Sequence, residues 1–332
     1  MKLICFVADN AAAALAEVHE RLGPDAVIVS VRRLPAPVLA RLWNKRGQIE
    51  VTAGVPDKSS APKTDTFSPP QNFLEGPAGF VSNADGWRSV AWLELMGLLP
   101  AHAERLQTHL RAVHGEAPDS PAEEWKIVHS ALSRFWLNPP ALDDPAYAGR
   151  PHVFIGPPGS GKTTALCKWL TLATLLDGRT ARAWRLDGST ANTAEFLVIH
   201  CETLGVPLER FWSKPETTGE LWFVDLPGVE ISDAAALGAM RSQLATLPSP
   251  RVHLVLNAAY ETSTLLAQWR AFEACQPENL IFTHLDEETR RVKLWNFVFG
   301  TNCSLRFFGA GQKIPGEFRN ASPELLLPAK NP

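Results

Sequence analysis

The sequence predicts an α/β protein built around a parallel sheet with helices on both faces. The main observation is a series of short apolar segments after residue 151, separated from one another mostly by stretches of helical periodicity. These segments are "HVFIG", "ARAWRLD", "LWFVD", "VHLVLN", "NLIFTH" and "SLRFFG". Near-continuous apolar strands that alternate with helices are typical of parallel sheets buried on both faces. The chain has 332 residues, which is enough for two or three domains.

A small α/β domain is expected at the start of the chain, over residues 1–56. Residues 2–7 are mostly apolar and suit a short strand, and Asn10 can cap the helix that follows. The segment "LGPDAVIVSVRR" then combines a Gly-Pro turn with a β-branched strand, and "IEVTAG" provides another short strand.

A linker and a helical domain are expected next. Residues 57–85 are rich in Pro, Ser, Lys, Gly and Asn, a composition typical of flexible segments. Residues 86–147 contain "WRSVAWLELMGLL", "AHAERLQTHLRAV" and "PAEEWKIVHSALSRFWL", whose apolar residues recur at three- and four-residue spacing. This spacing predicts a small helical bundle, after which the α/β domain with the parallel sheet occupies residues 148–332.

Composition argues against several classes of protein. The net charge of −3 gives no general basic field, so no direct binding of nucleic acid is expected. The five cysteines are scattered without a CxxC pair, which favours a reducing compartment and argues against structural zinc. The N-terminus is a poor signal peptide and no apolar stretch reaches the length of a membrane span, so we expect a cytoplasmic protein.

One basic stretch has a composition that could favour contact with a membrane surface. The segment "RRLPAPVLARLWNKR", residues 32–46, mixes Lys and Arg with Leu and Trp. It leaves open a peripheral contact with the inner face of the plasma membrane or with a partner. A solvated basic helix face is the simpler interpretation, because such short charge patterns are weakly specific.

The segment "VFIGPPGSGKTTALCKWL" carries the strongest functional signal. It satisfies the pattern G-x-x-x-x-G-K-[ST] and lies between an expected strand and an expected helix. Glycines allow backbone N–H groups to surround phosphates, the lysine binds the β/γ oxygens and the hydroxyl after it binds Mg²⁺. A chance glycine-rich turn is the alternative, and both flanking elements argue against it. The candidate phosphate-binding residues are Gly156, Gly159, Ser160, Gly161, Lys162, Thr163 and Thr164.

Such a loop requires an acid at the end of another strand to help hold the metal ion. Asp225 in "LWFVDLPG" and Asp187 in "AWRLDGST" are the two candidates, with Thr163 as the third metal ligand. Gly228 follows Asp225 closely and could offer its N–H to a γ-phosphate. The alternative for either aspartate is an ordinary helix N-cap or turn former.

The segment "IFTHLDEE" predicts the base preference. Asp286 lies just past a strand end, where its carboxylate can accept hydrogen bonds from N1–H and the exocyclic amine of guanine, a pair that adenine does not present. Thr283 would support the turn and His284 would lie against the base plane. Taken alone, His284 is better interpreted as a partly buried histidine at a strand end.

These motifs together resemble the signal-recognition-particle class of GTPases and, within it, the flagellar biosynthesis family FlhF. The family segments "GPTGVGKTT", "DTYRIGAVEQL", "DTAGR" and "TKLDE" align with "GPPGSGKTT", "DGSTANTAEFL", "DLPGV" and "THLDE". The family's closing Gly-Gln-x-x-Pro loop matches "GQKIP", which adds Gly311 and Gln312 to the nucleotide-binding candidates. The resemblance covers nearly the whole chain and equates its three domains with the family's B, N and G domains.

The resemblance implies a Mg²⁺-dependent GTPase, in which Lys162 binds phosphate and Asp187 orients the attacking water. It also implies a GTP-dependent homodimer, peripheral to the membrane, that helps to place the flagellum. A partner ATPase of the ParA/MinD type would be linked to hydrolysis.

Several departures from the family pattern concern hydrolysis. The family arginine implicated in hydrolysis falls on Thr190 and the glutamine of "EQL" on Phe196. The threonine and alanine of "DTAG" become Leu226 and Pro227, and the lysine that stacks on guanine becomes His284. We therefore expect slow or partner-dependent hydrolysis. A catalytically degenerate nucleotide-binding scaffold and a P-loop ATPase are the alternatives.

Overall fold

The computed structural model describes residues 2–8, 11–23, 26–34, 48–55, 86–141, 149–187, 195–216 and 219–327. Four features of the sequence analysis lie outside these ranges. They are the predicted helix cap Asn10, the expected linker at 57–85, most of the basic stretch at 32–46, and the segment 188–194 that contains Thr190.

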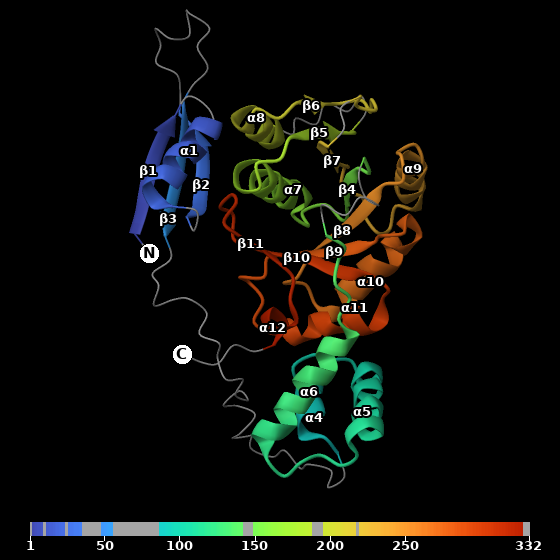
Figure 1. Ribbon diagram of the computed structural model, residues 1–332. Helices are drawn as coiled ribbons and strands as arrows, with labels where there is room; N and C mark the ends of the chain where they lie inside the picture. The colour runs from blue at the N-terminus through green and yellow to red at the C-terminus, as the bar shows by residue number, and fades with distance from the viewer. Residues whose placement is uncertain are drawn as a thin grey trace, which may run out of the picture.

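An eight-stranded sheet forms the centre of the molecule, as Figure 1 shows. Its strand order is β11-β10-β9-β8-β4-β7-β5-β6, and every pair is parallel except β10 with β11. This confirms the predicted fold class. The strands are β4 (His152–Ile155), β5 (Ala181–Arg185), β6 (Leu208–Glu209), β7 (Leu221–Asp225), β8 (Arg251–Asn257), β9 (Asn279–Thr283), β10 (Ser304–Ala310) and β11 (Glu317–Asn320).

Helices cover both faces of this sheet because its strands are apolar on both sides. In β4, Phe154 packs in one hydrophobic cluster with Trp169 of α7, while Val153 and Ile155 belong to the other cluster with α9, α10 and α11. A π-helical turn, Leu172–Leu176, continues α7. The helices are α7 (Lys162–Thr171), α8 (Glu195–Leu204), α9 (Ala234–Ala245), α10 (Thr262–Phe272), α11 (Trp295–Gly300) and α12 (Pro323–Leu326).

Three further helices form a unit below the sheet in Figure 1: α4 (Arg88–Leu95), α5 (Pro100–His114) and α6 (Pro121–Phe135). Asn296 of α11 joins this unit to the sheet domain. Its Oδ1 accepts a hydrogen bond from the N–H of Leu99 at 2.8 Å, and its Nδ2 donates to the carbonyl of Gly97 at 2.8 Å. Asn296 is fully buried, so its side chain makes these hydrogen bonds without competition from water.

The N-terminal unit consists of β1 (Lys2–Ala8), α1 (Ala11–Leu22), β2 (Val27–Arg33) and β3 (Ile49–Val55). The strands form an antiparallel sheet in the order β1-β3-β2. Its hydrophobic cluster includes Leu175, so the unit packs against the π-helical turn after α7. The predicted domain boundaries at residues 56, 85 and 147 fall outside the described residues and stay predictions.

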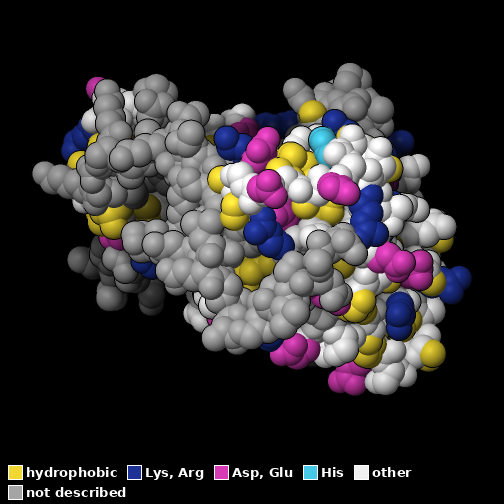
Figure 2. All heavy atoms as spheres, turned by 90° about the horizontal axis from the view of Figure 1, so that it is seen from below, with side chains coloured by type: hydrophobic (Ala, Val, Ile, Leu, Met, Phe, Trp, Pro, Cys, Tyr) yellow, Lys and Arg dark blue, Asp and Glu magenta, His cyan; other side chains and the backbone are white. Residues whose placement is uncertain are grey.

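The surface carries charges of both signs. Figure 2, seen from below, shows Lys and Arg side chains interspersed with Asp and Glu over the described part of that face. This mixture agrees with the small net charge of −3 for the whole sequence. None of the helices in the described ranges is long and apolar enough to cross a membrane.

A buried carboxylate organises the helical unit. Glu124 of α6 is fully buried, and its Oε1 accepts hydrogen bonds from the N–H of Ser89 at 2.6 Å and from the hydroxyl of Ser89 at 2.7 Å. Its Oε2 accepts a hydrogen bond from Nε of Arg88 at 3.2 Å. One side chain of α6 therefore satisfies donors at the start of α4, which lacks a side-chain cap of its own.

We expect Glu124→Ala to lower the free energy of unfolding by about 2–4 kcal/mol, because it leaves buried donors unpaired. Urea unfolding followed by circular dichroism measures the change. The matched control is Glu123→Ala, which removes an exposed carboxylate from the same helix. Equal effects of the two substitutions would contradict the proposed structural role of Glu124.

Buried histidines make stability depend on pH. Nε2 of His200 in α8 lies 2.8 Å from the hydroxyl of Thr171 and 3.2 Å from the carbonyl of Cys167, both in α7. Burial lowers the pKa of His200 to about 4. His152 and His253 face each other between β4 and β8, with Nδ1 and Nε2 3.0 Å apart, and burial lowers the pKa of each well below its ordinary value.

These three histidines are neutral in the folded protein near pH 6, whereas the unfolded chain binds protons there. We therefore expect the free energy of unfolding to fall as the pH is lowered from about 6.5 towards 4. Urea unfolding at a series of pH values measures this decline. His200→Gln should make it shallower, and the same substitution at the exposed His19 should leave it unchanged.

Candidate functional site

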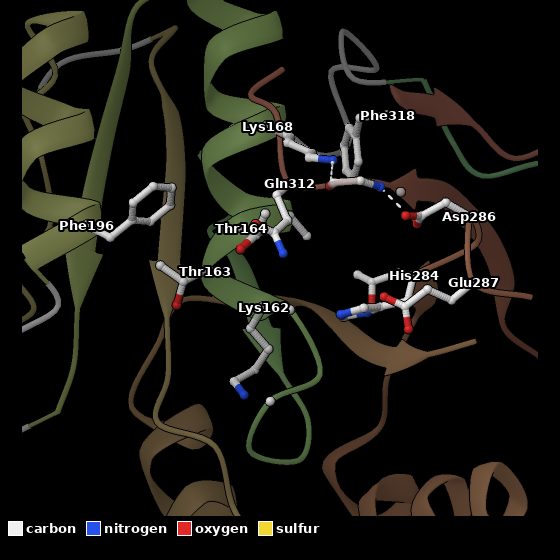
Figure 3. A pocket seen from close by; sticks show the side chains of 16 residues that line it. Lys162, Thr163, Thr164, Lys168, Phe196, His284, Asp286, Glu287, Gln312 and Phe318 are labelled. Atoms are coloured by element: carbon white, nitrogen blue, oxygen red, sulfur yellow. Dashed lines mark hydrogen bonds between the residues drawn. The ribbon is translucent and has the colours of Figure 1, made fainter. Parts of the chain in front are cut away.

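The loop that matches the phosphate-binding pattern runs from residue 156 to residue 161 between β4 and α7 (Figure 3). We call it the phosphate-type loop. Its geometry requires glycine at two positions. Gly156 has φ of +144°, and a Cβ there would lie 2.4 Å from the carbonyl oxygen of Val255. Gly161 has φ of +83°, and a Cβ there would lie 3.1 Å from Cγ2 of Thr283. The loop can therefore pack closely against the ends of β8 and β9.

A cavity of about 680 Å³ opens beside this loop. Figure 3 shows side chains entering it from α7 on one side and from the segments after β9 and β10 on the other. It brings together many of the predicted site residues: Gly159, Gly161, Lys162, Thr163, Thr164, Thr283, His284, Asp286, Gly311 and Gln312. The volume is within the usual range for a small-molecule site.

Thr283 links the two sides of the cavity. Its hydroxyl donates a hydrogen bond to the carbonyl of Ser160 in the loop at 2.7 Å, and it also lies 3.2 Å from the carbonyl of Leu256. Nδ1 of His284 lies 2.9 Å from the same hydroxyl oxygen. Because the single hydroxyl proton is directed to carbonyls, Nδ1 of His284 must be the donor. His284 has φ of +55°, a conformation in which His is enriched relative to most residues.

Asp286 lies at the far end of the cavity, exposed and held in place by the loop after β10. Its Oδ1 accepts a hydrogen bond from the N–H of Gly311 at 2.9 Å (Figure 3). This hydrogen bond lowers the pKa of the Asp286 carboxyl, so the group is ionised at neutral pH. Nζ of Lys168 donates to the carbonyls of Ala310 and Gly311, both at 2.7 Å. Sequence reasoning missed Lys168, although it lies on α7 one turn beyond Thr164.

A metal ion was predicted at three oxygen-bearing side chains, those of Thr163, Asp187 and Asp225, of which Thr163 lines the cavity. The hydroxyl of Thr163 donates to Oδ2 of Asp225 at 2.8 Å. Asp225 is fully buried, and its Oδ1 has no hydrogen-bond partner among the described residues. Burial raises the pKa of this carboxyl, and Arg185 opposes that effect. A hydroxyl with nearby carboxylates is a donor set that suits Mg²⁺.

Two arginines that sequence reasoning missed share this region. Arg185 forms an ion pair with Asp225, and its Nε lies 3.3 Å from Oδ2 of Asp187. Nη2 of Arg210 lies 2.7 Å from Oδ1 of Asp187, so both carboxylate oxygens of Asp187 have a guanidinium partner. The sequence offered one signal for Arg185, which stands two positions before Asp187 near the end of an expected strand. Neither arginine belongs to any of the aligned motifs.

Lys162 is folded beneath the loop. Its Nζ donates to the carbonyl of Pro157 at 2.8 Å, and burial lowers its pKa to about 8. Gly228 packs directly against the loop, because a Cβ there would lie 2.8 Å from Cα of Pro158 and 2.9 Å from Nζ of Lys162. Gly228 therefore lies beside the lysine.

Solved structures share this fold. A crystal structure of FlhF complexed with GMPPNP and Mg²⁺ has a TM-score of 0.60 and 20% identity, covering 71% of this chain and 95% of that one. The cell division protein FtsY of Thermotoga maritima has a TM-score of 0.56 and 16% identity, covering 72% of this chain and 84% of that one. The fold and the arrangement of motifs define a P-loop domain of the signal-recognition-particle GTPase type.

Curated sequences specify the relationship further. The flagellar biosynthesis protein FlhF of Bacillus subtilis is 26% identical over 179 residues, 52% of this chain and 49% of that protein. FlhF of Pseudomonas aeruginosa is 24% identical over 257 residues, 74% of this chain and 57% of that protein. The chain is a divergent relative of the FlhF proteins. It spans about half the length of these relatives, and no protein-family model matches it.

We expect Gly156→Ala to destabilise the protein by about 2–4 kcal/mol, because the new methyl group would overlap a backbone carbonyl at a strained φ. Gly238→Ala is the matched control, since a Cβ at that position in α9 meets no atom within 4 Å. Thermal unfolding of both variants measures the difference. A Gly156→Ala variant as stable as Gly238→Ala would contradict the close approach of the loop to β8.

Proposed function

We propose that the chain is a GTP-binding protein of the signal-recognition-particle class, with an FlhF-like role in flagellar placement or assembly or in membrane protein targeting. One observation carries the nucleotide assignment. The hydrogen bond from Thr283 to the carbonyl of Ser160 joins the phosphate-type loop to the turn that bears Asp286, across a single cavity. A nucleotide in this cavity can contact the loop with its phosphates and Asp286 with its base.

The preference for guanine rests on the Asp286 carboxylate. It is exposed and lines the cavity, and the N–H of Gly311 fixes one of its oxygens. An ionised carboxylate accepts hydrogen bonds and donates none, so it matches the two adjacent donors of guanine and not the edge of adenine. The FlhF structures complexed with GTP and with GMPPNP support the same ligand class.

Mg²⁺ is the metal that the donor set suits, and Thr163 and Asp225 would hold it. When bound, the ion would neutralise charge on the phosphates of the nucleotide. Lys162 would turn from the carbonyl of Pro157 to a phosphate. The backbone of Gly228 packs beside the lysine, and its N–H would serve the same phosphate. These roles of the metal ligands, the lysine and the glycine are part of the proposal and are supported by where the fold places each residue.

Slow hydrolysis is the second part of the proposal. Asp187 is the candidate for orienting water, yet Arg185 and Arg210 engage both of its oxygens. These ion pairs compete with a water molecule for the oxygens of Asp187. The same observation favours a second candidate function, a nucleotide-binding scaffold without useful turnover. A phosphate-release assay separates the two, with faster release on addition of a partner indicating partner-dependent hydrolysis.

The interaction partners stay predictions that depend on the family resemblance. They are a GTP-dependent homodimer, a ParA/MinD-type ATPase and a peripheral contact with the membrane. Light scattering of the chain with and without GMPPNP tests the first of them. A mass that does not change with nucleotide would contradict the homodimer.

We expect GTP to bind more tightly than ATP, and Asp286→Asn to remove about 1–3 kcal/mol of that preference. The amide replaces one acceptor by a donor that faces the donors of guanine. Isothermal titration with GMPPNP and with its adenine counterpart measures both affinities. The control is Glu287→Gln, which removes the same charge from the next position in the turn.

Equal binding of guanine and adenine nucleotides, unchanged by Asp286→Asn, would support a P-loop ATPase instead. No binding of either nucleotide would contradict the whole proposal. A similar loss of preference in Glu287→Gln would show that net charge, and not hydrogen bonding by Asp286, sets the preference.

A further inference from the structure

The guanidinium of Arg185 occupies the position between the candidate metal ligands. Strands β5 and β7 are parallel neighbours, and Arg185 is paired with Asp225 in their register. Directly paired residues of neighbouring strands project from the same face of a sheet. The last residue of β5 therefore directs its long side chain to the last residue of β7.

Arg185 contacts all three predicted metal ligands. It forms an ion pair with Oδ2 of Asp225, its Nη1 lies 3.5 Å from the hydroxyl oxygen of Thr163, and its Nε lies 3.3 Å from Oδ2 of Asp187. The side chain of Arg185 is 12% exposed, and those of Asp187 and Asp225 are 2% and 0% exposed. Little water therefore screens these contacts.

The cluster has no excess of negative charge without a metal ion, and the nearby Lys162 ammonium adds a further positive charge beside Asp225. Asp187 and Asp225 contribute two negative charges, and Arg185 and Arg210 contribute two positive charges. A guanidinium carries a positive charge and accepts no hydrogen bonds, so it cannot share these oxygens with a divalent ion at close range. A divalent ion added to the cluster would meet uncompensated repulsion unless the guanidinium moved away.

We propose that Arg185 competes with Mg²⁺ for Thr163 and Asp225, so that this chain binds guanine nucleotide with little dependence on Mg²⁺. The inference rests on the proposed nucleotide-binding function. The ion and the guanidinium require the same two atoms, Oδ2 of Asp225 and the hydroxyl oxygen of Thr163. Arg185 therefore determines how much the site needs a divalent cation.

The first experiment compares GMPPNP binding to the full chain in Mg²⁺ and in EDTA by isothermal titration. For the unaltered chain we expect the two dissociation constants to differ by less than about threefold. For Arg185→Met, which keeps an unbranched apolar chain and removes the guanidinium charge, we expect GMPPNP binding to weaken by more than about tenfold when Mg²⁺ is replaced by EDTA. Arg182→Met is the control, because Arg182 lies on the same strand and pairs instead with Glu209 and Glu220.

The second experiment needs no nucleotide. Mn²⁺ alone is titrated into the full chain and followed by electron paramagnetic resonance. We expect Arg185→Met to bind Mn²⁺ at least about tenfold more tightly than the unaltered chain and the Arg182→Met control. This result would stand even if the chain bound no nucleotide, so it separates the inference from the proposed function.

Two results would overturn the inference. One is a loss of more than about tenfold in GMPPNP affinity when the unaltered chain is moved from Mg²⁺ to EDTA. The other is equal Mn²⁺ affinity in the unaltered chain and Arg185→Met. If Arg185→Met does not fold, the titrations of the unaltered chain still test the inference. Tight Mn²⁺ binding by the unaltered chain would also contradict competition by Arg185.

Discussion

The buried carboxylate of Asp225 is the constraint on which the site depends. It ends β7 with no exposed surface, and a charge left unpaired in such a position is strongly destabilising. Thr163 at the start of α7 and Arg185 at the end of β5 provide its partners. Arg185 also contacts Asp187, which in turn binds Arg210. One buried charge thus fixes the ends of two strands and the first turn of a helix.

The opposite side of the loop is fixed by close packing and hydrogen bonds between neutral groups. Gly156 and Gly161 allow the backbone to approach the ends of β8 and β9, and the hydroxyl of Thr283 then reaches the carbonyl of Ser160. This hydrogen bond ties the end of β9 to the phosphate-type loop. Asp286 is positioned by Gly311, whose loop Lys168 of α7 also holds. The helix that follows the phosphate-type loop therefore also supports the end of the cavity that carries Asp286.

The sequence was most informative where a function requires a fixed local pattern. The phosphate-type loop and the turn around Asp286 could be predicted because their residues are consecutive or nearly so. Arg185 and Lys168 were missed because their partners are distant in sequence, and only the strand order and the loop after β10 bring them together. The buried Glu124 was missed for the same reason, since its partner Ser89 lies on another helix.

The sequence by itself determined the α/β class, the composition of the loop and the chemical type of the residue at each strand end. The tertiary structure decided the charge balance around Asp225. Strand order cannot be deduced from local periodicity, because β5 and β7 become neighbours only when the sheet assembles. Electrostatic interactions depend on distance and burial, so an arginine that is unremarkable in the chain becomes the direct partner of a buried carboxylate.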